Sequence, residues 1–213
     1  LMDEILKKYS LLSQLDVPRE TFLDFEKFIS MVIEKNNEIN IISKESAKTD
    51  VIKDRHVIDS SQILDFIDLK NDNATDIGTG GGFPGIIMAI ILKRKKKNIK
   101  IHLYEKSHHK CVFLREISRK LNLDTEVIQK DIFGITELET GTIMARAFKP
   151  LPIVLDLIER NFSSYKNIIL FMGKSGNKVL EETLKNWDLD FEKKKSITNA
   201  DSFLLNIKRI ERK

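Results

Sequence analysis

Five glycines and one aspartate within ten residues are the part of this 213-residue chain best suited to chemistry. They lie in the stretch Asp76 to Gly85, which reads Asp-Ile-Gly-Thr-Gly-Gly-Gly-Phe-Pro-Gly. A short strand pattern precedes the stretch and the apolar run 86–92 follows it, so the order strand, glycine loop, helix is predicted. In that geometry backbone N–H groups and a helix N-terminus face a ligand. Glycine is needed there because a side chain would hold the ligand away from the backbone.

The glycines fit two fingerprints. Gly80, Gly82 and Gly85 spell G-x-G-x-x-G, the dinucleotide signature, whereas Asp76 to Gly82 spells D-x-G-x-G-x-G. We favour the second, because a carboxylate at the strand end disfavours a doubly negative pyrophosphate; no Gly-Lys-Ser/Thr follows, which excludes a P-loop. An acidic strand end without a loop lysine suits a cationic ligand without phosphate, such as S-adenosylmethionine. Asp76, Gly78 and Gly80 are therefore candidate cofactor residues.

The elements that must position these residues alternate from residue 74 onward. Strand patterns occupy 74–77, 99–105, 125–129, 142–145, 167–172, 189–195 and 202–209. Helical patterns lie between them at 107–121, 150–161 and 178–186. The alternation predicts an α/β fold with a mostly parallel seven-stranded sheet. Earlier helices, expected over 2–15, from Pro18 and over 48–67, predict an N-terminal helical extension (1–70) packed on a core (71–213), in one compact unit.

Residues at strand ends are further candidates, because ligands of open α/β sheets bind beyond the carboxyl ends of the strands. Glu105 ends the second strand and is placed to accept both hydroxyls of a ribose. Asp131 and Ile132 follow the third strand and are placed against an adenine, although an ordinary turn aspartate explains Asp131 equally well. Arg146 follows the fourth strand and is placed to hold substrate, phosphate or a methionine carboxylate. From its position alone, a surface arginine is an equal alternative.

Composition narrows the class of protein. The formal charge of +4 permits a nucleic-acid partner without demanding one. The single cysteine, Cys111, excludes a disulfide framework, and the adjacent His108 and His109 point to different sides of a helix, so we expect no metal. No apolar run has the length of a membrane span and no signal peptide is evident, so we expect a cytoplasmic protein without a membrane partner. Lys93–Lys97 is the best candidate contact for a phosphate backbone, although such runs are more often solvated helix ends.

Further motifs make the combination specific. The chain carries Asn-Glu-Ile-Asn-Ile at 37–41, Arg-His-Val-Ile-Asp-Ser at 55–60, Gly-Phe-Pro-Gly at 82–85, Phe-Leu-Arg at 113–115 and Arg-Ala-Phe at 146–148. With these motifs it resembles, over nearly its whole length, the glucose-inhibited division protein B family of guanine-N7 methyltransferases of bacterial small-subunit ribosomal RNA. It departs from the family's usual pattern at Asn36, Ile42, Lys130 to Ile132 and Met172 to Lys174.

The resemblance implies a Rossmann-like class I methyltransferase core with an N-terminal helical extension. It implies S-adenosylmethionine as donor, S-adenosylhomocysteine as product, and 16S ribosomal RNA or the small ribosomal subunit as partner; we expect a monomer. By motif match, Glu105 falls on the family's ribose-binding acid. The other matches to its cofactor positions are Gly78, Phe83, Asp131, Ile132 and Arg146.

The expected reaction is in-line transfer of a methyl group from sulfonium to guanine N7. This nitrogen carries no proton, so no general base is required. Arg146 is the candidate catalytic residue that links cofactor and substrate, with the guanine unstacked against Phe83 or Phe148. The alternatives are a methyltransferase for another RNA position or a small molecule, a nucleotide-binding oxidoreductase, and a non-enzymatic RNA-binding scaffold. An RNA substrate would lose support if Lys93–Lys97 and Arg55 faced away from the cleft.

Overall fold

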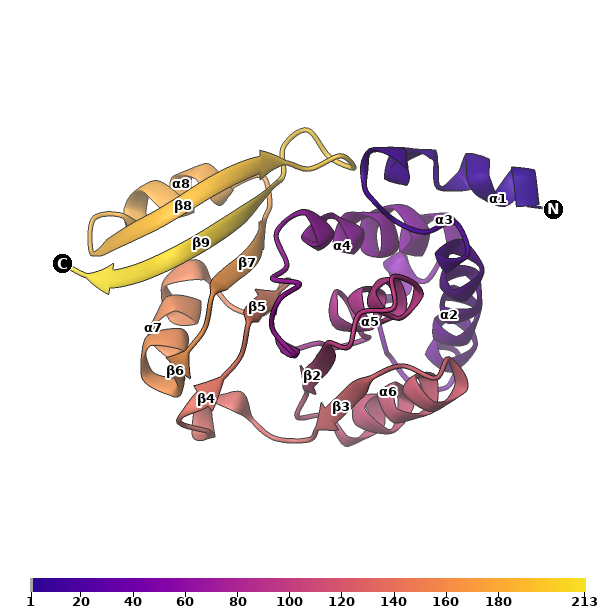
Figure 1. The fold of residues 1–213 in the computed structure, drawn as a ribbon, viewed down its shortest axis with the longest axis horizontal. Helices are drawn as coiled ribbons and strands as arrows, with labels where there is room; N and C mark the ends of the chain where they lie inside the picture. Colours follow the sequence, from indigo (N-terminus) through magenta and orange to yellow (C-terminus); the bar gives the residue numbers. More distant parts are fainter. Residues whose placement is uncertain (1) are drawn as a thin grey trace.

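A seven-stranded sheet forms the centre of the fold in the computed structural model, which describes residues 2–213 (Figure 1). Its strand order is β3-β2-β1-β5-β7-β9-β8. The strands are β1 (Asn73–Ile77), β2 (Lys100–Tyr104), β3 (Thr125–Ile128), β5 (Thr142–Ala145), β7 (Asn167–Met172), β8 (Trp187–Lys195) and β9 (Phe203–Arg212). The first five in the spatial order run parallel, and β9 is antiparallel to both of its neighbours. The predicted α/β class and mostly parallel seven-stranded sheet are confirmed.

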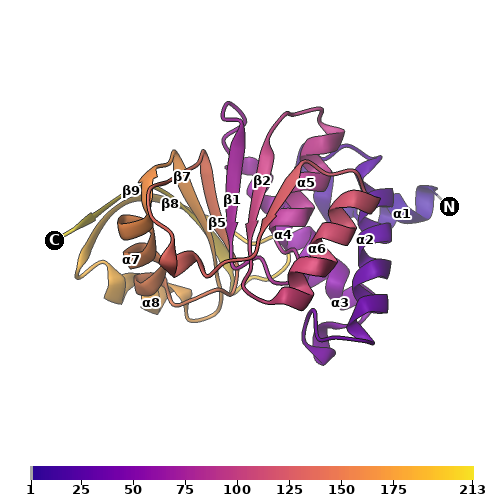
Figure 2. The same cartoon turned by 90° about the horizontal axis from the view of Figure 1, so that it is seen from below.

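Helices cover both faces of this sheet (Figure 2). The helices α5 (Gly85–Arg94) and α6 (His108–Lys120) lie on one face with the N-terminal helices. The helices α7 (Leu151–Asn161) and α8 (Gly176–Thr183) lie on the other face. Side chains of a strand alternate between faces, so Met144 of β5 joins the cluster around α5 while its neighbour Ile143 joins the cluster around α7. Each central strand is therefore buried on both faces, as parallel strands usually are.

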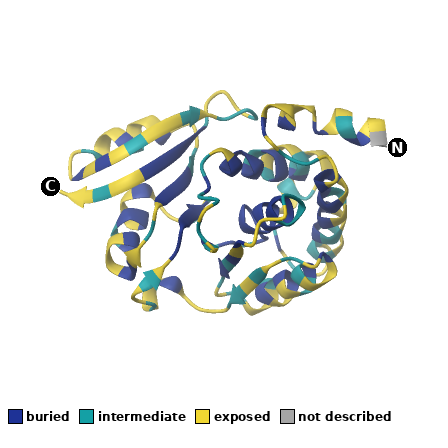
Figure 3. Cartoon of the chain, in the orientation of Figure 1, coloured by how far each residue is buried: buried dark blue, intermediate teal, exposed yellow. Residues whose placement is uncertain are grey.

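The glycine loop leads directly into the most deeply buried helix. Every residue of α5 from Gly85 to Leu92 is buried, which Figure 3 shows as an almost continuous dark segment. Pro84 occupies the N-cap position just before the first turn of α5. A helix so enclosed is a rigid support for the loop at its N-terminus.

The N-terminal extension differs in detail from the prediction. It comprises α1 (Met2–Lys8), η1 (Ser10–Gln14), α2 (Thr21–Asn36), η2 (Lys44–Ser46), α3 (Thr49–Val51), the π-helical η3 (Ile52–Ile58), α4 (Asp59–Ser61) and η4 (Gln62–Asp65). The helix expected over 2–15 breaks at Tyr9, whose ring stacks on Phe22 with centroids 4.8 Å apart and whose hydroxyl donates to Glu26 at 2.8 Å. The extension and α5 share one hydrophobic cluster, so the extension is part of the same core.

A second, two-stranded sheet was not expected from the sequence. It pairs β4 (Leu138–Glu139) with β6 (Phe162–Ser164) in parallel. Both strands are very short, and their sequences show no alternating pattern. Next to this pair, Asn161 at the end of α7 donates to the carbonyl of Ile132 at 3.1 Å. The strand pair and this hydrogen bond together hold the loop after β3 in place.

Candidate active site

A cavity of about 550 Å³ opens at the carboxyl ends of the parallel strands. Its walls come from the loops after β1, β2, β3 and β5, together with one residue of the extension, His56. A cavity of this size suits a small-molecule cofactor. The lining contains seven of the eight predicted cofactor residues: Gly78, Gly80, Phe83, Glu105, Asp131, Ile132 and Arg146.

The glycine loop forms one wall with a backbone that favours glycine. Gly78, Gly80 and Gly82 have φ values of +72°, +57° and +97°. Residues with a side chain rarely adopt these left-handed conformations. A Cβ added at Gly78 would lie 2.1 Å from Cδ2 of Phe148, so the close approach also excludes a side chain. The loop therefore offers bare backbone to the cavity, as the sequence predicts.

Asp76 is the predicted residue that does not line the cavity. Its side chain is fully buried, and its Oδ2 accepts a hydrogen bond of 2.7 Å from the N–H of Gly85, the first residue of α5. Burial away from water raises the pKa of Asp76 to about 7, although the bond from Gly85 opposes the rise. The expected direct contact between Asp76 and a ligand is thus corrected: the carboxyl group fastens the N-terminus of α5 behind the loop.

Glu105 holds the glycine loop from the side of the cavity. Its Oε2 accepts from the N–H of Gly80 at 3.1 Å, and its Oε1 accepts from the N–H of Ser107 at 2.8 Å. The carboxylate therefore joins the end of β2 to both the glycine loop and the start of α6. It lies in the cavity wall next to Gly80, where a carboxylate retains lone pairs for further donors.

Arg146 lines the cavity but directs its guanidinium toward the extension. Its Nη1 lies 2.6 Å from Nδ1 of His56, its Nη2 donates to the carbonyl oxygen of Arg55, and its Nε lies 3.4 Å from Oδ2 of Asp59. Each nitrogen of the guanidinium thus has a partner in η3 or α4. Burial lowers the pKa of Arg146, and the carboxylate of Asp59 opposes that effect.

His56 and Asp59 are site residues that sequence reasoning missed. Burial, together with the charges of Arg146 and Arg55, lowers the pKa of His56 to about 4, so its ring is neutral at pH 7. Asp59 Oδ1 also accepts from Ser196 and Thr198, both at 3.0 Å, in the loop between β8 and β9. The signal in the sequence was the motif at 55–60, which marked a family resemblance but gave no role to either side chain.

Aromatic side chains are arranged differently from the expectation. The Phe83 ring is only 6% exposed and packs between Phe28 and His56, with centroids 5.2 and 4.9 Å away. It lacks the exposed face that stacking on a guanine requires. Phe148 stacks instead on Phe133, with centroids 5.9 Å apart, and Phe133 is 45% exposed at the cavity. Phe133 is the aromatic residue that the sequence analysis missed.

The loop after β3 supports both interpretations of Asp131. The residue lines the cavity, and its Oδ1 also accepts from the N–H of Phe133 at 3.1 Å as the cap of η5 (Ile132–Gly134). Ile132 is 3% exposed and contributes an apolar surface to the lining.

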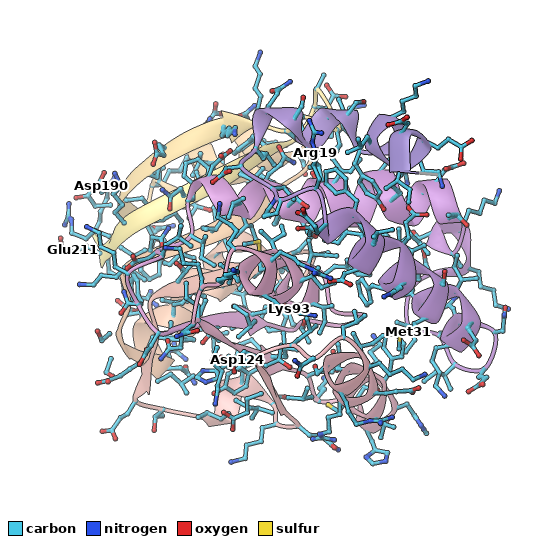
Figure 4. The ribbon with its side chains drawn as sticks, turned by 45° about the vertical axis from the view of Figure 1, so that its right-hand side comes forward. Arg19, Met31, Lys93, Asp124, Asp190 and Glu211 are labelled. Carbon is cyan, nitrogen blue, oxygen red and sulfur yellow. The ribbon has the colours of Figure 1, made fainter. Side chains whose placement is uncertain are left out.

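The lysine run Lys93–Lys97 lies at the end of α5 remote from the cavity. Lys93 lies between α5 and the end of α6, where it donates to the carbonyl of Leu121 at 2.6 Å (Figure 4). Arg94 Nη2 lies 2.6 Å from Oδ2 of the buried Asp24, and Lys95 pairs with Asp16. Lys93 Nζ also lies 3.9 Å from Asp24 Oδ2, so Lys93, Arg94 and Lys95 all link the core to the extension. The expected phosphate contact at Lys93–Lys97 therefore loses its support at this cavity. Four other lysines, Lys106, Lys110, Lys130 and Lys149, line the cavity instead, and we call them the lysine rim.

Between residues 2 and 213, no group of three or more His, Cys, Asp or Glu side chains is arranged to hold a metal ion. Over the same residues, none of the helices combines the length and apolar character needed to cross a lipid bilayer.

The fold defines the class of protein. The chain superposes with a TM-score of 0.53 on a SAM-dependent methyltransferase from Aquifex aeolicus, at 12% identity, covering 84% of this chain and 97% of the other. It superposes with a TM-score of 0.54 on the 16S rRNA methylase RmtB, at 10% identity and 98% coverage of both chains. These likenesses show the α/β fold of S-adenosylmethionine-dependent methyltransferases.

Sequence comparison defines the family. The family profile described as rRNA small subunit methyltransferase G (GidB) matches residues 22–205, so the chain belongs to this family. It is 63% identical, over 212 residues and the full length of both chains, to ribosomal RNA small subunit methyltransferase G of Pelagibacter ubique strain HTCC1062. The protein of that name from Ruegeria sp. strain TM1040 is 32% identical over 199 residues, covering 93% of this chain and 96% of the relative. The resemblance found in the sequence motifs is confirmed.

Proposed function

We propose that this chain transfers a methyl group from S-adenosylmethionine to N7 of a guanine in 16S ribosomal RNA and releases S-adenosylhomocysteine. The observation that carries the proposal is the convergence of seven predicted residues on one cavity, in a member of this methyltransferase family. We further propose that the enzyme acts as a monomer in the cytoplasm and uses no metal.

The lining fits the cofactor. The glycine loop has a left-handed backbone, which lets a ligand approach Gly78 and Gly80 closely. The loop contains no lysine, so it lacks the side chain that usually binds a phosphate. We assign Glu105 to the ribose hydroxyls, and Ile132 with Asp131 to the adenine, because all three line the cavity. When bound, the cofactor supplies an electrophilic methyl group on a sulfonium.

The chain's own contribution to the reaction is positioning and exclusion of water. Guanine N7 has a free lone pair and no proton, so a site for this reaction needs no general base. The neutral His56 and the paired Arg146 agree with such chemistry, because neither is poised to take up a proton. Asp59 compensates the charge of Arg146, which lowers its repulsion of the positive charge that the methylated base acquires.

The rim of the cavity fits an RNA substrate. The lysine rim is placed to neutralise phosphates around the cavity mouth. The exposed Phe133 with Phe148 offers a surface on which an unstacked base can lie. Because an enzyme that modifies a base must reach its edge, we expect the guanine to enter the cavity out of its stack.

The experiment is methyl transfer from labelled S-adenosylmethionine to small ribosomal subunits and to deproteinised 16S RNA, both free of the modification. Borohydride and aniline treatment, which cleaves RNA at 7-methylguanosine, then locates the product. Cleavage at one guanine supports the proposal. Label at another base position favours the alternative methyltransferase, and RNA binding without label favours the scaffold.

Arg146 is tested in the same assay. We expect Arg146→Ala to lower the rate at least about 10-fold, because it removes the contacts with Arg55, His56 and Asp59, and one charged hydrogen bond alone contributes about 1.5–3 kcal/mol. A wild-type rate for Arg146→Ala would show that Arg146 does not link cofactor and substrate.

A further inference from the structure

Asp59, Arg146 and His56 form a chain of polar contacts that ends in the cavity wall. Asp59 Oδ2 lies 3.4 Å from Arg146 Nε, and Arg146 Nη1 lies 2.6 Å from His56 Nδ1. The His56 ring also packs on Phe83, with centroids 4.9 Å apart, and it lines the cavity. Contacts on two sides therefore fix the orientation of this imidazole.

The contact with Arg146 also determines where the proton of His56 lies. A guanidinium only donates hydrogen bonds, so Nδ1 of His56 must be the acceptor. A neutral imidazole with an accepting Nδ1 carries its proton on Nε2. His56 is thus a hydrogen-bond donor through Nε2, and it stays one across the physiological pH range because the ring is neutral at pH 7.

This donor lacks a partner within the protein. Among residues 2–213, no atom accepts a hydrogen bond from His56 Nε2, which is buried. A buried donor without an acceptor is unfavourable. The ring lines the cavity, so a bound ligand can supply that acceptor once the atoms that cover Nε2 move aside.

We propose that His56 recognises the methyl-accepting base by donating from Nε2 to the oxygen next to the methylated nitrogen, which in guanine is O6. This inference rests on the proposed function. Guanine presents N7 and O6 as two neighbouring acceptors, whereas adenine presents N7 beside an N6 amino donor. A fixed hydrogen-bond donor in the cavity wall therefore pairs with O6 of guanine but meets another donor, the N6 amino group, in adenine. Arg146 and Asp59 are positioning residues that keep the imidazole in this tautomer.

The test compares two substrates with two proteins. The substrates are 16S RNA fragments with guanine or with 2-aminopurine, which keeps N7 but lacks O6, at the position mapped in the methylation assay. For the wild type we expect kcat/KM to fall about 10- to 100-fold on 2-aminopurine, because the donor then has no acceptor. For His56→Phe, which keeps a ring against Phe83 but removes the donor, we expect both substrates to react at similar, low rates.

Controls separate recognition from folding. His56→Phe should bind S-adenosylhomocysteine within about 2-fold of the wild type, since the donor is assigned to the acceptor base. His56→Gln, which retains an acceptor and a donor, should restore part of the preference for guanine. In ¹⁵N NMR spectra the proton of wild-type His56 should lie on Nε2.

Three results would overturn the inference. An unchanged ratio of guanine to 2-aminopurine rates in His56→Phe would remove His56 from base recognition while leaving the methyltransferase function intact. A proton on Nδ1 would contradict the tautomer, independently of activity. No guanine-N7 methylation by the wild type would overturn the proposed function itself, and this inference with it.

Discussion

The carboxyl group of Asp76 accepts a hydrogen bond from the backbone N–H of Gly85 at 2.7 Å, across the whole glycine loop. This bond joins the carboxyl end of β1 to the first residue of α5, so it closes the loop at its base. Adding a Cβ at Gly85 would place it 2.7 Å from Asp76 Oδ2, which leaves no room for a side chain. The loop is therefore shaped by a buried acid that no ligand needs to touch.

The first prediction concerns stability and pH. Burial raises the pKa of Asp76 from 3.8 to about 7, so between these values the folded state holds a proton that the unfolded state has lost. This contribution to the free energy of unfolding is therefore complete below about pH 4 and is lost as the pH rises through about 7, a change on the order of 4 kcal/mol. Urea unfolding of wild type and Asp76→Asn from pH 4.5 to 7.5 measures it.

The difference between the two proteins isolates Asp76 from other titrations. His56, whose pKa is lowered to about 4, contributes in the opposite direction, because its unfolded form binds a proton below pH 6.5. His56 titrates in both proteins, whereas Asp76→Asn lacks the acid and keeps an acceptor for Gly85. A stability difference that does not change with pH would contradict the raised pKa.

The second prediction concerns the bare backbone at Gly78. Gly78→Ala must adopt φ near +72° with its Cβ against the Phe148 ring. We expect the free energy of unfolding to fall by about 1–2 kcal/mol and the affinity for S-adenosylhomocysteine to fall at least about 10-fold, since Phe148 must move. Calorimetric titration and urea unfolding measure the two effects.

Gly173→Ala is the matched control for that substitution. An added Cβ at Gly173 meets no atom within 4 Å, and its φ is not left-handed. The control should stay within about 0.5 kcal/mol of the wild type. Equal effects at both glycines would show that neither the left-handed φ of Gly78 nor its contact with Phe148 requires glycine.

The third prediction concerns the ribose. Glu105→Gln keeps an oxygen for one of the two amides it holds but loses the charge, so S-adenosylhomocysteine should bind about 10- to 100-fold more weakly. Glu126→Gln, an exposed change on the neighbouring strand outside the cavity lining, is the control and should bind normally. Unchanged binding by Glu105→Gln would contradict a contact between Glu105 and the ribose. The role of Glu105 would then be limited to holding the N–H groups of Gly80 and Ser107.

Local patterns made much of the fold and part of the site predictable. Strands and helices of the core follow from hydrophobic alternation, and the glycine loop and Glu105 follow from their positions at strand ends. The direction of Asp76 was missed because the alternation along β1 places it on the face of Ala74, under α5, rather than at the edge of the sheet. Strand position alone does not distinguish a ligand contact from a helix anchor.

The contribution of the extension was not predictable for a different reason. The contact between His56 and Arg146 joins residues 90 positions apart, and it depends on the π-helical turn of η3. Helical periodicity predicts the segment but neither its π-helical turn nor its partner. Likewise, no pattern in the neighbouring sequence predicts that Lys93 and Arg94 pair with Asp24 and so link α5 to the extension.

The last prediction separates the lysine rim from the lysine run at the far end of α5. Lys130 lines the cavity and Lys97 does not, and both side chains are exposed. Changing either to alanine removes one positive charge, so a general effect of net charge would be the same for both. If Lys130 contacts an RNA phosphate, Lys130→Ala should weaken binding of 16S RNA fragments and reduce the slope of log K against log salt by about 0.7–0.9. Lys97→Ala should leave both unchanged. Titrations at several salt concentrations decide between them, and a larger effect at Lys97 would place the RNA on the opposite end of α5, away from the cavity.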